Sequence, residues 1–164
     1  MAEAARWTGA MRAGLSGRGP GIGGRRILTA GDATPAQPGA VAGAVRGLLR
    51  AEGLLMLALA LIAYGRFGEG WGFFAAVFLL PDIAFLAYLA GPRAGAIAYN
   101  ATHSTIGPML AGAAGMLAGA PLLLSVGLVW AAHVGLDRAL GWGLKYARGF
   151  AQTHLGPIGR PDPW

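Results

Sequence analysis

The chain has 164 residues, of which 55% are hydrophobic and only 12% are charged. A soluble domain carries roughly a quarter of charged residues, so this composition indicates a protein whose solvent is lipid. The chain contains no cysteine, which excludes disulfides, thiolate metal sites and thiol nucleophiles. The net charge of +6 lies in tails and short loops, so we attribute it to membrane orientation and expect no nucleic-acid partner.

The N-terminal residues 1–40 are rich in Gly, Ala, Pro and Arg and have no periodic apolar face. Because such a segment cannot bury enough apolar surface to fold, we predict a disordered cytoplasmic tail that contacts membrane lipid.

Four apolar stretches follow, and a helix needs roughly 20 such residues to cross a bilayer. They are residues 41–65, 71–90, 94–119 and 121–142, of which the first carries charged residues near its start. The connections are very short, so consecutive helices must run antiparallel. The sequence therefore predicts an all-α fold, an integral membrane four-helix up-down-up-down bundle over residues 41–142. Residues 143–164 are predicted to be a basic cytoplasmic segment.

The basic residues predict the orientation of this bundle. One side of the predicted membrane has only Arg66, whereas the other has the arginines of the tail and Arg46, Arg50, Arg93, Arg138, Lys145, Arg148 and Arg160. Loops rich in Lys and Arg stay in the cytoplasm. We therefore expect a protein of the bacterial cytoplasmic membrane with both termini in the cytoplasm.

Small residues recur every four positions in the third stretch, at Gly107, Ala111, Gly115 and Gly119. Such a ladder lets a neighbouring backbone approach closely. We expect it to serve packing inside the bundle, with a homodimer or a larger membrane complex as the alternative.

Ionisable residues are costly at membrane depth, and this chain places several at one level. At 1.5 Å per residue, Asp82, His103 and His133 each lie roughly 13 Å from the cytoplasmic end of their helix. Asn100 and Asp137 lie a turn closer to the cytoplasm, and Glu52 lies at the entry of the first helix. We therefore predict a polar layer to which all four helices contribute.

Local patterns support this layer. His133 and Asp137 are one helical turn apart, the spacing that two ligands of one ion need. Tyr99, Asn100 and His103 share a face, and Pro81 removes a backbone hydrogen bond beside Asp82.

The leading hypothesis is a membrane-embedded metal-dependent hydrolase that acts on a lipid or amphiphile from the cytoplasmic side. One divalent metal ion of the zinc class would be bound by His103, His133 and Asp82, with Asp137 as fourth ligand or catalytic group. Glu52 would be the general base. The expected substrate-binding residues are Asn100, Arg138, Lys145 and His154.

Several alternatives stay open. His103 and His133 could be axial ligands of a haem, although the nearby carboxylates weaken that interpretation. Asp82 and Glu52 could carry protons in a small transporter. The polar groups could also only satisfy one another, in a non-catalytic accessory or structural subunit of a larger membrane complex. The C-terminal segment could cap the polar layer through His154, or lie at the interface, anchored by Trp142 and Tyr146.

Seven short motifs together resemble an uncharacterised family of small four-helix bacterial membrane proteins, domain of unknown function 4260. These motifs are Leu49-Arg50-Ala-Glu52-Gly53, Pro81-Asp82, Tyr88-Leu-Ala-Gly-Pro-Arg93, Tyr99-Asn100-Ala-Thr-His103, Ala132-His133-Val-Gly-Leu-Asp137-Arg138, Gly141-Trp-Gly-Leu-Lys145-Tyr146 and Phe150-Ala-Gln-Thr153-His154-Leu-Gly156. The resemblance runs from about residue 46 to residue 159. It implies a membrane location and a fold, but no activity.

A weaker resemblance concerns the membrane-bound metal-dependent hydrolases. Thr102-His103-Ser104 and His133-x-x-x-Asp137 resemble parts of their motifs, which read roughly HRGxTHS and HxxxD. The first His of that family falls on Ala98 and the second Asp of its PDxD element falls on Ala84. The resemblance therefore implies metal chemistry with a different ligand set, which Glu52 or Asn100 would complete.

Overall fold

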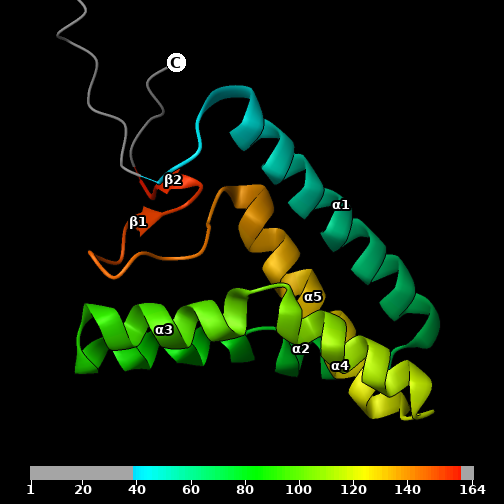
Figure 1. The fold of residues 1–164 in the computed structure, drawn as a ribbon. Helices are drawn as coiled ribbons and strands as arrows, with labels where there is room; N and C mark the ends of the chain where they lie inside the picture. Colours follow the sequence, from blue (N-terminus) through cyan, green and yellow to red (C-terminus); the bar gives the residue numbers. More distant parts are fainter. Residues whose placement is uncertain (1–38, 160–164) are drawn as a thin grey trace, which may run out of the picture. The chain divides into compact units, whose positions relative to one another are not determined.

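The computed structural model describes residues 39–159, and it is mainly helical (Figure 1). The elements in chain order are α1 (Gly43–Phe67), α2 (Trp71–Val77), the 3-10 helix η1 (Leu80–Ala90), α3 (Pro92–His103), α4 (Ile106–Leu117), α5 (Pro121–Leu140) and the two-residue strands β1 (Gln152–Thr153) and β2 (Gly156–Pro157). The strands form an antiparallel hairpin in the C-terminal segment. The all-α prediction is confirmed. The predicted tail lies outside the described residues, apart from its last two.

The second predicted span changes its winding at Pro81. The α-helix ends at Val77, and a 3-10 helix runs on from Leu80. Proline has no N–H and therefore breaks the α-helical hydrogen-bond ladder, as the sequence predicted. The carbonyl oxygen of Pro81 instead accepts a hydrogen bond from the Thr102 hydroxyl at 3.1 Å. This hydrogen bond joins the second span to the third, between the residues that directly precede Asp82 and His103.

The third predicted span is divided in two. Helix α3 ends at His103, and Ser104 adopts an extended conformation before α4 begins at Ile106. Pro108 accounts for the break, because it lacks the N–H that Ser104 would need and its ring would clash with that carbonyl. The break leaves two carbonyl oxygens without helical partners. The Trp130 indole donates to that of Thr102, and Arg138 donates to that of His103 at 3.3 Å.

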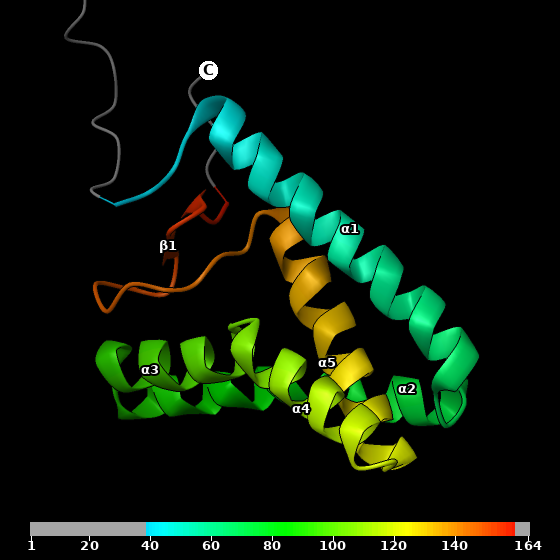
Figure 2. The ribbon, with the colours of Figure 1, turned by 45° about the vertical axis from the view of Figure 1, so that its right-hand side comes forward.

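Helix packing is divided between two groups of helices. Helix α5 packs on α1 and α4, whereas α3 packs on η1 (Figures 1 and 2). Glycines allow the closest approaches. A β-carbon on Gly135 would lie 2.7 Å from the backbone nitrogen of Leu57, and one on Gly107 would overlap the Trp130 ring. The small residues of α4 thus pack against α5, and Gly119 serves the turn with a positive φ of 61°.

Large apolar side chains lie mostly on the outside of these helices. Exposed examples occur on α1, η1, α4 and α5, and they include Ile62 at 70% and Leu117 at 88% exposure. The buried residues are largely small, aromatic or polar. Three helical stretches in the described part of the chain are long and apolar enough to cross a membrane: Gly43–Phe67, Trp71–Ala90 and Pro121–Leu140. This distribution suits a protein surrounded by lipid.

Candidate metal centre

Three side chains from three different elements converge at the breaks in the helices. Nε2 of His103 lies 3.1 Å from Nε2 of His133 and 3.3 Å from Oδ1 of Asp82. Oδ1 of Asp82 lies 3.5 Å from Nε2 of His133. All three ligand atoms lie within 4.8 Å of one another, so these residues could hold a metal ion. The sequence prediction that these three residues meet is confirmed.

Hydrogen bonding orients His103 towards this cluster. Its Nδ1 lies 3.0 Å from the carbonyl oxygen of Tyr99, which can only accept. When Nδ1 carries the proton towards this oxygen, the lone pair of Nε2 points at Asp82 and His133. Metal-bound histidines usually donate their second N–H to such an acceptor. The Tyr99 ring also stacks on the imidazole, with ring centroids 3.7 Å apart.

His133 and Asp82 are held differently. The His133 ring packs edge-on against Phe78, and its Nδ1 is buried without a hydrogen-bond partner among residues 39–159. His133 is therefore placed by this packing and by the contacts of its Nε2 with His103 and Asp82. The Asp82 side chain is 33% exposed, whereas both histidines are buried. Asp82 is thus the side from which an ion or a substrate can reach the cluster.

Asp137 lies next to this cluster. Its Oδ2 is 3.5 Å from Nε2 of His103 and accepts a hydrogen bond from the Tyr99 hydroxyl at 2.9 Å. The group of three potential ligands does not include it. Its position suits a group that works beside an ion better than a fourth ligand.

The spacing of the three ligand atoms can be compared with that of a zinc site and of a haem site. In a tetrahedral zinc site with bonds of about 2.0–2.1 Å, neighbouring ligand atoms lie about 3.3–3.4 Å apart. The three distances of 3.1–3.5 Å match this spacing. Axial haem ligands would stand about 4 Å apart, because two bonds of about 2 Å point in opposite directions. The Nε2–Nε2 distance of 3.1 Å is nearer to the zinc spacing than to this haem spacing.

The structure does not bring Glu52 into the centre. It is exposed on α1 and makes none of the contacts that join the cluster. The polar layer therefore draws on η1, α3 and α5, and not on all four predicted helices. Gly53, the next residue, is the one that faces α5, where it lies against Arg138 and Ala139.

Asn100 and Lys145 bind each other. The Asn100 amide donates to the backbone carbonyl of Lys145 at 2.9 Å and accepts from its backbone N–H at 2.7 Å. The Lys145 ammonium donates to the carbonyl of Phe150 at 2.9 Å, and it lies 4.6 Å from the centre of the Tyr99 ring. Burial lowers the pKa of Lys145 to about 8. Both residues were predicted to bind substrate, and here their polar atoms are taken up by the protein.

The C-terminal segment covers this side of the cluster. Gly141, left-handed with φ 89°, ends α5 and turns the chain back. His154 then contacts Arg138, with Nε2 and Nη1 2.7 Å apart, and its backbone oxygen accepts from Val41 at 2.8 Å. Burial, together with the charge of Arg138, lowers the pKa of His154. This arrangement favours the cap over the interface segment.

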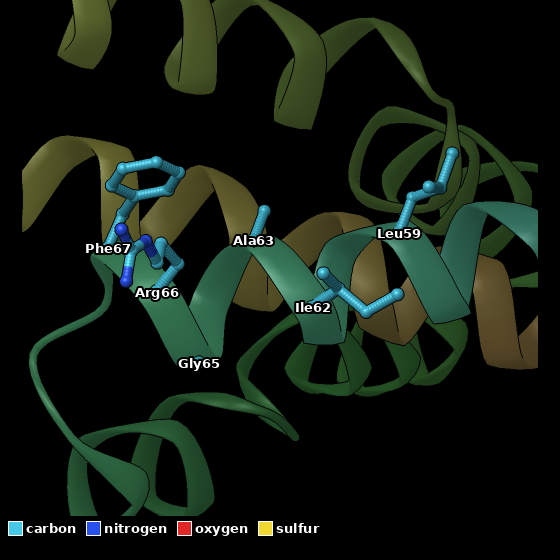
Figure 3. A pocket seen from close by; sticks show the side chains of 6 residues that line it. All are labelled: Leu59, Ile62, Ala63, Gly65, Arg66 and Phe67. Atoms are coloured by element: carbon cyan, nitrogen blue, oxygen red, sulfur yellow. The ribbon is translucent and has the colours of Figure 1, made fainter.

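Two hollows differ in what surrounds them. A shallow one of about 640 Å³ runs along α1 and offers no metal-binding group. It is lined by Leu59, Ile62, Ala63, Gly65, Arg66 and Phe67 (Figure 3). A smaller apolar one of about 210 Å³ lies beside the cluster. Its walls are Val77, Leu80, Pro81, Thr102, Val126 and Trp130. Pro81 and Thr102 directly precede the candidate ligands Asp82 and His103.

The sequence reasoning missed the role of the helix break. Pro108 in an otherwise apolar stretch was the available signal, because it predicts a break in the helix before it. The pairing of the freed carbonyls with Trp130 and Arg138 depends on tertiary packing and has no local signal.

Comparison with known proteins identifies the family but no activity. The comparisons with curated proteins and with solved structures gave no match. A family model described as a domain of unknown function, DUF4260, matches residues 46–158. This match spans all the helices described above except the first residues of α1. The chain therefore belongs to the DUF4260 family.

Proposed function

We propose that the protein is a membrane-embedded metal-dependent hydrolase whose substrate is a lipid or another amphiphile. The observation that carries the proposal is the convergence of Asp82, His103 and His133 on one point, from three different elements, η1, α3 and α5. A zinc-class ion held by these residues supplies Lewis acidity and lowers the pKa of a water that it binds.

Three protein ligands favour catalysis over a structural role. Structural zinc sites use four protein ligands, whereas catalytic sites keep one position open for water or substrate. The described residues offer three ligands, one of which is partly exposed. The chemistry of the donors, two imidazoles and one carboxylate, is that of the zinc class.

Asp137 takes the role of general base in this proposal. Its carboxylate lies beside the cluster, and the Tyr99 hydroxyl fixes one of its oxygens at 2.9 Å. In the hydrolysis, a water oxygen forms a bond to the ester centre while the bond to the leaving oxygen breaks. Asp137 accepts the proton of the water and returns it to the leaving oxygen.

The apolar hollow supports an amphiphilic substrate. Its walls include Pro81 and Thr102, next in sequence to two of the ligands, and it offers almost only apolar surface. An alkyl chain in this hollow would place a polar end near Asp82. The substrate would thus enter sideways from the membrane, in which α1, η1 and α5 present their exposed apolar side chains.

We also infer that both termini face the cytoplasm. Arg50 donates to the Ala139 carbonyl at 2.9 Å, so the start of α1 and the end of α5 lie together. The same end holds Lys145 and His154, and such basic ends remain in the cytoplasm. A cysteine introduced at Gly149 is expected to react with a membrane-impermeant maleimide only in opened cells. Labelling in intact cells would contradict this orientation.

The hydrolase proposal is tested with two matched carboxylate-to-amide variants. Zinc-loaded protein in detergent is incubated with a mixture of phospholipids and neutral lipids, and released fragments are measured by mass spectrometry. Asp137→Asn is expected to keep its zinc and to lose about 10²–10⁴-fold in rate. Glu52→Gln is expected to retain the wild-type rate, because Glu52 lies outside the cluster.

Three results would contradict the proposal or part of it. A normal rate in Asp137→Asn with a loss in Glu52→Gln would reverse the assignment of the base. A zinc-loaded wild type that releases no fragment from any lipid would rule out the hydrolase. Copurification of a stoichiometric partner without any metal would identify an accessory subunit instead.

A further inference from the structure

Arg138 and His154 meet where α5 joins the C-terminal segment, and their hydrogen bonds conflict. Nη1 of Arg138 lies 2.7 Å from Nε2 of His154. On the other side of the imidazole, Nδ1 lies 2.8 Å from the backbone nitrogen of Leu144. The guanidinium and the backbone N–H are both donors and have no lone pair to offer.

A proton count shows that His154 cannot satisfy both neighbours. A neutral imidazole carries one N–H, so only one of its nitrogens can accept. If Nδ1 accepts from Leu144, then Nε2 carries the proton and faces a donor of Arg138. A protonated imidazole has two N–H groups and makes the conflict worse. In every protonation state available near neutral pH, at least one donor therefore faces another donor.

An anion would remove this conflict. One anionic oxygen beside Nη1 and Nε2 can accept from Arg138 and from His154 together. In the described part of the chain, no carboxylate lies within ion-pair distance of Arg138. Both side chains are half-buried, so an anion there would be partly shielded from water.

The other terminal nitrogen of Arg138, Nη2, links the Arg138–His154 pair to the metal centre. It donates to the backbone carbonyl of His103 at 3.3 Å. His103 supplies one of the three candidate ligands. An anion on Arg138 and His154 therefore lies beside the candidate catalytic centre. A tetrahedral oxyanion has enough oxygens to accept from both donors and still direct another oxygen towards that centre.

We propose that Arg138 and His154 bind a phosphate group of the substrate. This assignment rests on the proposed function, because it makes the amphiphile a phosphate ester whose apolar part occupies the hollow near Thr102. Arg138 suits this role, since its planar donors match two oxygens of one phosphate. His154 supplies a third donor from the C-terminal segment.

The experiment separates phosphate binding from metal binding. All proteins carry His133→Ala and are treated with a chelator, so that no metal contributes. Binding of inorganic phosphate is measured by titration calorimetry, with acetate as a second probe. Arg138→Gln and Arg138→Lys are compared with Arg148→Gln, which removes the same charge from an exposed position.

We expect phosphate to bind and acetate to bind at least tenfold more weakly. Arg138→Gln should weaken phosphate binding at least tenfold, and Arg138→Lys, which retains the charge and the stem, should weaken it severalfold. Arg148→Gln should change it less than twofold. Absence of phosphate binding, equal losses in Arg138→Gln and Arg148→Gln, or tighter binding of acetate would overturn the site. The metal content of the wild type is measured separately. If the wild type binds no metal, the phosphate-binding result can therefore still be interpreted.

A further binding experiment distinguishes a lipid phosphate from free inorganic phosphate as the ligand. Micelles that contain phosphatidic acid are compared with micelles that contain diacylglycerol. Tighter binding of phosphatidic acid than of inorganic phosphate supports a lipid phosphate. Equal binding of both types of micelle, without any effect of Arg138→Gln, would overturn the assignment of a lipid phosphate.

Discussion

The metal centre and the Asn100–Lys145 pair both contact the Tyr99 ring, and they are polar in different ways. Around Lys145, the Asn100 amide pairs with both the backbone N–H and the backbone carbonyl of Lys145, and the ammonium donates to the carbonyl of Phe150. Around His103, two carboxylate oxygens and a second imidazole nitrogen surround one lone pair. The first arrangement is complete by itself. The arrangement around His103 needs protons or a cation. This need is typical of a binding site and not of polar groups that only stabilise the fold.

The largest effect should come from zinc added to the metal centre. A ligand that binds only the folded state stabilises it by about 4 kcal/mol at a thousandfold excess over its Kd. Zinc should therefore raise the thermal unfolding temperature of the wild type in detergent. His103→Ala should abolish this rise, whereas His154→Ala, which removes a histidine outside the cluster, should retain it. A rise that persists in His103→Ala would show that zinc binds elsewhere.

The next effect concerns the Asn100–Lys145 pair. Its disruption should lower the stability of the protein without changing the response to zinc. Asn100→Leu removes two hydrogen bonds and leaves the N–H and carbonyl of Lys145 without partners. We expect a loss of about 3 kcal/mol in the free energy of unfolding, measured by denaturation in mixed micelles. The zinc response should stay intact. Loss of zinc binding in this variant would make Asn100 part of the metal centre.

Tyr99 belongs to both regions, and its hydroxyl should matter mainly to Asp137. Tyr99→Phe keeps the ring stacked on His103 and leaves Oδ2 of Asp137 without this donor. A loss of about 1 kcal/mol in stability is expected, because one hydrogen bond disappears. The zinc content should not change. If Tyr99→Phe loses its metal, the hydroxyl orients the ligands and not only Asp137.

A further effect is a pH dependence carried by Lys145. Its pKa is lowered from 10.5 to about 8 in the folded protein, because burial disfavours the ammonium. Between these values the unfolded chain binds more protons, so the wild type should gain stability as the pH rises from about 8 to 10.5. Lys145→Met should lack this component. Identical pH profiles of the two proteins would show that Lys145 is not buried as described.

Much of the fold and the three candidate ligands of the metal centre could be predicted from the sequence. Apolar stretches of membrane length predicted the helices, and Pro81 predicted the change in winding of the second one. Counting residues along antiparallel helices placed Asp82, His103 and His133 at one level, because the rise per residue is fixed. The structure then brings their ligand atoms together.

The remaining features of the site depended on the rotation of each helix about its axis and on tertiary contacts. The depth of a residue in the membrane determines neither of these. Glu52 has a suitable depth, but it is exposed on α1, while its neighbour Gly53 faces α5. Asn100 and Lys145 have the residue types of a binding site, yet they bind each other across 45 residues. Composition and spacing cannot distinguish a polar group that has a partner from one that needs a ligand.

The metal content of the wild-type protein tests the central claim most directly. Elemental analysis of protein purified in detergent without chelators should give about one zinc-class ion per chain, and the same protein with His133→Ala should give none. A wild type without metal, which also fails to take up zinc on dialysis, would contradict the metal centre and leave the cluster as a set of groups that only satisfy one another.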